Sequence, residues 1–146
     1  MTGGRTPVLP YTIHRCAADS PWVQVTDGHG FPDAWLTDYL HFVAWQDHPP
    51  RHVWHEAREL VQAAVWLAVH ARTWSTGDLG VWTGYALALA GDQPDRAASH
   101  AVHRAVATLH RAYAFWHWRR TVPWQPFPPA AADRQRWLQS LLPPLD

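Results

Sequence analysis

The chain has 146 residues, 12 basic and 12 acidic side chains and a single cysteine, Cys16. This length is sufficient for a hydrophobic core without disulfides, so we predict one domain over residues 1–146. One cysteine excludes an intramolecular disulfide and favours a reducing compartment. The sequence starts without a secretory signal, and its apolar stretches are shorter than the roughly 20 residues of a membrane helix. We therefore expect a cytoplasmic protein with no membrane contact.

The neutral total charge conceals an uneven distribution along the chain. Residues 1–93 carry five Arg, seven Asp and two Glu, a net charge of −4, whereas residues 94–146 carry seven Arg and three Asp, a net charge of +4. Such a division favours either self-association or an acidic partner for the basic part. The 11 tryptophans exceed the usual need of a core this size. Because Trp is enriched at interfaces, we expect some of them to face a partner.

The N-terminal segment, residues 1–31, lacks helical periodicity and is predicted to be irregular. Within it, residues 22–26 alternate between apolar and polar side chains, as a short strand does, and residues 27–30 have the composition of a turn. Residues 11–15 are the candidate partner strand, so a short β-hairpin is possible here.

Apolar periodicity and end signals predict an all-α compact bundle of about five helices. Asp33 and Pro94-Asp95 are start signals, whereas Pro49-Pro50, Gly77 and Gly91 are stop signals. The third helix is apolar on nearly all sides, which predicts burial in the centre of the bundle. A Pro-rich connection, residues 121–129, precedes the last helix and carries Trp124 and Phe127. The predicted helices span residues 33–47, 51–74, 81–90, 94–120 and 130–142.

The helix over residues 94–120 has its charges on one side and its core residues on the other. The predicted core stripe is Val102, Val106, Leu109, Tyr113 and Trp116. No acidic residue follows Asp95 at its start. Arginine forks match phosphate oxygens, and an exposed Trp can stack on a base, so this side is a candidate surface for nucleic acid. The candidate binding residues are Arg96, His100, His103, Arg104, His110, Arg111, His117, Trp118 and Arg119.

Two other interpretations of this basic side remain open. The first is the solvated outer face of an ordinary bundle helix, but such a face usually mixes acidic with basic residues, and here the acidic residues are missing. The second is a helix that lies on a membrane surface, but its apolar stripe is needed for the core of the protein.

A second group of candidate residues lies on the helix predicted over residues 51–74. His52, His55, Glu56 and Glu59 crowd one face, and imidazole with carboxylate can ligate zinc or iron. No second copy of this pattern occurs elsewhere, so two local charge pairs are the simpler interpretation. On the same predicted helix, a stack of Trp66, His70 and Trp74 is a candidate site for haem or another flat ligand.

No catalytic motif and no cofactor motif is present, so we expect no enzymatic activity and no cofactor. The leading hypothesis is a non-enzymatic helical subunit of a larger assembly that binds the RNA or DNA backbone. A protein–protein adaptor or a homo-oligomer, in which acidic and basic parts of different copies meet, is the alternative. A metal- or haem-binding helical bundle is the second alternative.

Overall fold

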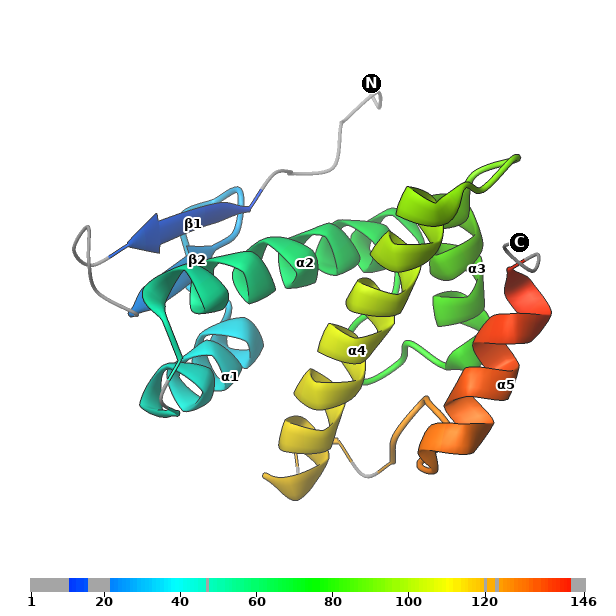
Figure 1. The fold of residues 1–146 in the computed structure, drawn as a ribbon. Helices are drawn as coiled ribbons and strands as arrows, with labels where there is room; N and C mark the ends of the chain where they lie inside the picture. The colour runs from blue at the N-terminus through cyan, green and yellow to red at the C-terminus, as the bar shows by residue number, and fades with distance from the viewer. Residues whose placement is uncertain (1–10, 16–21, 47, 120, 123, 143–146) are drawn as a thin grey trace. The chain divides into compact units, whose positions relative to one another are not determined.

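The computed structural model describes residues 11–15, 22–46, 48–119, 121–122 and 124–142. This described part contains five helices and one two-stranded sheet, which confirms the predicted mostly α-helical fold (Figure 1). The chain divides into two compact units, Met1–Arg72 and Thr73–Asp146, called here the first and second unit. The organisation as one domain stays a prediction.

The first unit begins with the β-hairpin that the sequence indicated. Strands β1 (Thr12–Arg15) and β2 (Val23–Thr26) pair antiparallel, with Ile13 opposite Val25. In β2, Val23 and Val25 are buried while Gln24 between them is exposed, as the alternation of side chains along a strand requires. Cys16 lies outside the described residues. The hairpin packs on the following helices through β2 (Figure 1).

The predicted turn after β2 is closed by one aspartate. The Asp27 carboxylate accepts hydrogen bonds from the backbone N–H groups of His29 and Phe31, at 2.9 and 3.1 Å. Gly30 has a φ of +83°, a conformation that favours glycine. The turn therefore leads directly to Asp33, which begins the first helix.

Helices α1 (Ala34–Trp45) and α2 (Pro50–Val69) complete the first unit. The Asp33 carboxylate caps α1 by accepting from the Leu36 N–H at 3.0 Å, and Pro50 occupies the first turn of α2, where its missing N–H has no consequence. The predicted end of α1 at residue 47 falls on a residue that is not described. The helices bury one mainly aliphatic face each, with Leu36, Leu40, Val43, Val53, Leu60 and Leu67 in the core.

The prediction that the second helix continues to Trp74 is wrong. The backbone leaves the helix at Ala71, whose φ of +54° is left-handed. The Arg72 N–H then bonds to the Leu67 carbonyl at 2.8 Å, and the Ala71 N–H bonds to the Ala68 carbonyl at 3.1 Å. This pair of bonds is the Schellman ending, which normally uses glycine. Because alanine occupies the position, the sequence placed the stop at Gly77 instead.

The second unit begins with α3 (Leu79–Ala90), which starts two residues before its predicted position because the Asp78 carboxylate caps it through the Val81 N–H. Gly91, with a φ of +77°, ends it as predicted. The expectation that this helix is buried in the centre of the bundle is wrong for one side of it. Helix α3 contacts α4 and α5, but Gly80, Leu87 and Ala88 are exposed, since its apolar surface exceeds the area that these two neighbours cover.

Aromatic rings fill the core of the second unit. Trp82 and Trp116 are each only 1% exposed, and Trp74 lies 4.9 Å from Trp116 between ring centroids. Tyr113 lies edge-on to both Trp82 and Trp116, and its hydroxyl donates to the Trp74 carbonyl at 2.6 Å. Burial raises the pKa of the Tyr113 phenol. The hydroxyl therefore stays protonated and keeps this bond.

The Pro-rich connection follows the core and leads into α5 (Ala131–Leu141), which is one residue shorter at each end than predicted. Phe127 is buried against Trp82 and Tyr113, whereas Trp124 is 38% exposed. Helix α5 is attached to α3 by a hydrogen bond from the Trp137 indole N–H to the Thr83 hydroxyl at 3.2 Å. The connection thus closes the aromatic core and carries one Trp on the surface.

Candidate nucleic-acid interface

Helix α4 (Arg96–Trp118) carries most of the candidate surface. The Asp95 carboxylate caps it by accepting from the Ala98 N–H at 2.8 Å, as the start signal indicated. The predicted end at residue 120 lies outside the described part of the chain. No Asp or Glu occurs between the first and last residues of α4. A helix of 23 residues is about 35 Å long, so the surface extends over that length.

The buried side of α4 contains the whole predicted core stripe, from Val102 to Trp116. It is broader than predicted, because Ala105, Thr108, Ala112 and Phe115 are buried as well. The remaining residues of α4 are exposed or half-buried and form its other side. The helix therefore packs along one side, and the residues of its basic side are exposed or half-buried.

The basic face of α4 consists of the nine predicted binding residues, and the structure brings them to the exposed side of one unit. Two of them, His103 and His110, are half-buried, while the other seven are exposed. Trp118 at the C-terminal end is 68% exposed. The exposed members are Arg96, His100, Arg104, Arg111, His117, Trp118 and Arg119.

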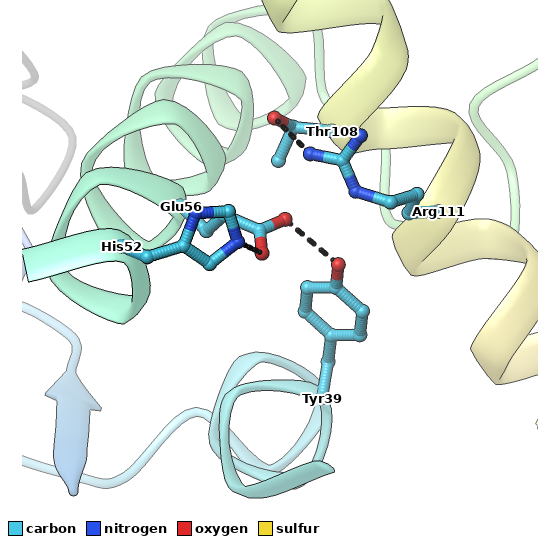
Figure 2. A network of polar contacts seen from close by, with 5 residues as sticks. All are labelled: Tyr39, His52, Glu56, Thr108 and Arg111. Carbon is cyan, nitrogen blue, oxygen red and sulfur yellow. Dashed lines mark hydrogen bonds and ion pairs between the residues drawn. The ribbon is translucent and has the colours of Figure 1, made fainter. Parts of the chain in front are cut away.

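Local hydrogen bonds orient several members of the basic face. The Arg111 Nη2 donates to the Thr108 hydroxyl at 3.3 Å (Figure 2). His103 and His117 each place Nδ1 against a backbone carbonyl, that of Ser99 at 2.8 Å and that of Val122 at 3.2 Å. Since a carbonyl only accepts, Nδ1 carries the hydrogen in both rings, and the Nε2 atom of the neutral ring is an acceptor. These two imidazoles therefore need a second proton before Nε2 can donate to an anion.

The charges of two arginines act on the pKa of His110, and one of these arginines was not indicated by the sequence. Burial, then the charge of Arg134, then the charge of Arg111 lower the pKa of the His110 imidazole. Arg134 belongs to α5, so its approach to α4 depends on how two helices pack. Periodicity along a single helix carries no signal for such a residue.

An aromatic group lies at the C-terminal end of the basic face. The ring of Trp118 lies 6.0 Å from that of Phe115, and the Arg119 guanidinium lies 5.8 Å from the Phe115 ring centroid. An exposed indole flanked by His117 and Arg119 has the components of a base-stacking platform beside cationic groups.

The candidate metal ligands on α2 form a hydrogen-bonded network in the first unit. The buried Glu56 carboxylate accepts from the Tyr39 hydroxyl at 2.8 Å and lies 3.1 Å from Nε2 of His52 (Figure 2). His55 is exposed and Glu59 half-buried. Across the described ranges, no three His, Cys, Asp or Glu side chains gather as metal ligands would. The observed role of Glu56 is to join α1 and α2.

The predicted stack of three rings on α2 is reduced to two. Trp66 and His70 do stack, with centroids 4.0 Å apart, and His70 Nδ1 bonds to the Trp66 carbonyl at 2.8 Å. Trp74 lies beyond the helix end at Val69, and its indole packs against Trp82 and Trp116. The early end of α2 thus removes the third member of the candidate haem site.

Among the described residues, no helix combines the length and the apolarity needed to cross a membrane. Comparison of the chain with models of protein families, with curated proteins and with solved structures finds no match. Function is therefore inferred from the chemistry of the surface itself.

Proposed function

We propose that this protein is a non-enzymatic helical subunit of a cytoplasmic assembly, and that the basic face of α4 binds the phosphate backbone of RNA or DNA. The observation that carries the proposal is the exposure of Arg96, Arg104 and Arg111 on one side of a helix without a carboxylate. Arginine forks pair with phosphate oxygens, and their charge attracts a polyanion over distance.

The spacing along α4 supports a backbone contact rather than a single anion. Arg104 and Arg111 are seven residues apart and therefore about 10 Å apart along the axis, and His103, His110 and His117 repeat at the same interval. Trp118 adds an exposed ring on which a base can stack without selecting its sequence. The surface therefore suits sequence-independent binding, with single-stranded RNA favoured by the exposed indole.

The proposal is tested by fluorescence anisotropy with labelled single-stranded RNA and duplex DNA over a series of salt concentrations. Affinity should fall steeply with salt, because each neutralised phosphate releases counterions. Replacing Arg104 and Arg111 together by Ala should lower the affinity and reduce the logarithmic salt slope by about 1.5 to 2. Absence of binding at low salt overturns the proposal.

The matched control for this pair is Arg51→Ala with Arg58→Ala. Both residues are exposed on α2, in the first unit, and the double variant changes the net charge by the same amount. Binding and salt slope should stay close to those of the unchanged protein. An equal loss from both double variants would show that net charge alone, and not the basic face, is responsible.

Exposed aromatic side chains favour protein contact as a second function. Trp45 of α1 is 79% exposed and meets Trp22 edge-on at 5.7 Å, with Phe42 of the same helix 37% exposed. Exposed Trp residues are typical of binding hot spots. Sedimentation over a range of concentrations tests for self-association, which Trp45→Ala should weaken. A strict monomer at all concentrations removes the homo-oligomer.

A further inference from the structure

We propose that His103 and His117 of the basic face contact phosphate groups through their Nε2 atoms as imidazolium ions, so that nucleic-acid binding takes up protons and tightens as the pH falls. This inference deepens the proposed function and rests on it, since it concerns the regulation of the same surface. Histidine changes its charge between about pH 5 and pH 8, so the basic face responds to pH within that range.

Each of the two rings is held by one nitrogen and offers the other. The Nδ1–H of His103 donates to the Ser99 carbonyl at 2.8 Å, and that of His117 donates to the Val122 carbonyl at 3.2 Å. Among the described residues, neither Nε2 atom has a hydrogen-bond partner. In the neutral ring, Nε2 carries a lone pair that repels a phosphate oxygen, whereas in the imidazolium it donates to one. Protonation therefore converts each ring from an acceptor into a charged donor.

The position of His117 favours the protonated ring. It lies in the last turn of α4, where the partial negative charge of the helix end stabilises a cation. The Val122 carbonyl that it contacts is fixed in turn, because the Thr121 N–H bonds to the Trp116 carbonyl at 2.8 Å and directs the chain back toward the helix end. A ring oriented in advance loses little further freedom when it binds a phosphate oxygen.

On α4 itself, the charged neighbours of the two rings are cations. His100 lies one turn before His103 on the same side of the helix. The phenol of Tyr113 lies one turn before His117, but it is buried. After the N-cap Asp95, α4 carries no carboxylate with which a protonated ring could pair, so a bound phosphate provides the negative charge that favours an imidazolium. The other charged or titratable residues of α4 and its C-cap are Arg96, Arg104, His110, Arg111 and Arg119.

The neighbouring segments of the second unit add little negative charge. Helix α3, which packs against α4, has Tyr85 as its only ionisable side chain, and the described residues of the Pro-rich connection have none. The ionisable residues of α5 are Asp133, Arg134 and Arg136, and Asp133 pairs with Arg136. In these three segments, the single carboxylate is therefore already paired with an arginine.

The two rings are separate contacts along the helix. They are 14 residues apart, which is about 21 Å along the axis and about 40° around it. One phosphate group cannot reach both, so each ring takes up its proton independently of the other. His110 lies between them, but burial and the charges of Arg134 and Arg111 lower its pKa, so it gains its proton at a lower pH. The response near neutral pH is therefore assigned to His103 and His117.

The test measures binding of a uridine homopolymer RNA to the full chain by fluorescence anisotropy, at about pH 5.5 and about pH 7.5 and at one ionic strength. Uracil does not titrate in this range, so a change in affinity belongs to the protein. A histidine of ordinary pKa, about 6.5, that must be protonated gives about three- to tenfold tighter binding at the lower pH, and two give about ten- to hundredfold. Calorimetry in two buffers of different ionisation enthalpy should detect about one proton taken up per protein at about pH 7.

His103→Gln with His117→Gln removes both titrating rings. This double variant should reduce the pH effect to about threefold or less, with the larger loss of affinity at the lower pH, and each single variant should remove about half of the proton uptake. The matched control is His29→Gln with His55→Gln, because both residues are exposed histidines of the first unit. The control should retain the pH effect and the proton uptake.

His103→Arg with His117→Arg separates a folding defect from a loss of the contacts. Arginine stays charged at both pH values. The variant should therefore bind RNA at about pH 7.5 about as tightly as the unchanged protein does at about pH 5.5, without proton uptake. Failure to tighten at the higher pH, a full pH effect in the double Gln variant, or an equal loss in the His29 and His55 control overturns the inference.

The same measurements distinguish this inference from the proposed function. Salt-dependent RNA binding that is independent of pH and takes up no proton leaves the proposed function standing and overturns the proton linkage. Absence of RNA binding at both pH values overturns both. Binding that is detected only at the lower pH, and that the double Gln variant loses, supports both.

Discussion

The two units differ in whether tryptophan contributes to their cores. In the first unit, none of the five described tryptophans is buried, and the buried side chains are mainly aliphatic, with Tyr39 the one aromatic ring among them. In the second unit, Trp74, Trp82 and Trp116 are buried together with Tyr113 and Phe127. Tryptophan therefore builds the core of the second unit, whereas the five described tryptophans of the first unit are half-buried or, in the case of Trp45, exposed.

The buried polar side chains of the two units differ as well. The first unit buries a carboxylate, Glu56, which requires donors such as the hydroxyl of Tyr39. In the second unit, the buried polar side chains that the structure describes are the hydroxyls of Ser99 and Thr108, and the arginines and the basic face lie at the surface. This contrast indicates that the first unit depends on one internal polar network, whereas the second depends on aromatic packing.

The largest expected effect comes from removing one indole from the aromatic core. Trp116→Ala should lower the free energy of unfolding by about 3 to 5 kcal/mol, because a cavity replaces a ring that contacts Trp74 and Tyr113. Urea unfolding followed by circular dichroism measures it. Trp118→Ala, on the same helix but exposed, and Trp45→Ala in the first unit should each change stability by no more than about 0.5 kcal/mol. A large loss from Trp45→Ala would show that this exposed indole stabilises the first unit as Trp116 stabilises the second.

A smaller loss of stability is expected when the hydroxyl of a buried tyrosine is removed, and each unit offers one such residue. Tyr39→Phe removes a hydrogen bond to a carboxylate and should lower the free energy of unfolding by about 1.5 to 3 kcal/mol. Tyr113→Phe removes a bond to a neutral carbonyl and should lower it by about 0.5 to 1.5 kcal/mol. The difference between the two variants, measured in the same urea experiment, sharpens the distinction between the units. Equal losses would show that Glu56 is adequately satisfied by its other partners.

The smallest expected effect is a gain of stability from a substitution at Ala71, which precedes the last residue of the first unit. Ala71→Gly removes the steric cost of a left-handed alanine, partly offset by greater freedom of the unfolded chain. The free energy of unfolding should rise by up to about 1 kcal/mol. The matched control is Ala68→Gly, which lies one turn earlier in regular helix and should lower it by about 0.5 to 1 kcal/mol. If Ala71→Gly destabilises as Ala68→Gly does, the left-handed ending is not maintained in solution.

The sequence by itself determined the helical segments, the hairpin and the basic face of α4. These features depend on periodicity and on end signals within a few residues, such as the caps at Asp33 and Asp95. For the same reason, it predicted the core stripe from Val102 to Trp116. Interactions of this range repeat along one helix, so they are visible in a single sequence.

Only the tertiary structure decided where α2 ends, which tryptophans are buried and which arginine of another helix affects the pKa of His110. The left-handed conformation of Ala71 runs against the preference of alanine, so the residue type gives no signal that the helix ends there. Trp74 and Trp118 are the same residue type, yet one is 6% and the other 68% exposed. Arg134, 24 residues further along the chain on another helix, lowers the pKa of His110 by its charge. Packing between segments far apart in sequence produces these features, and a pattern along one segment does not encode them.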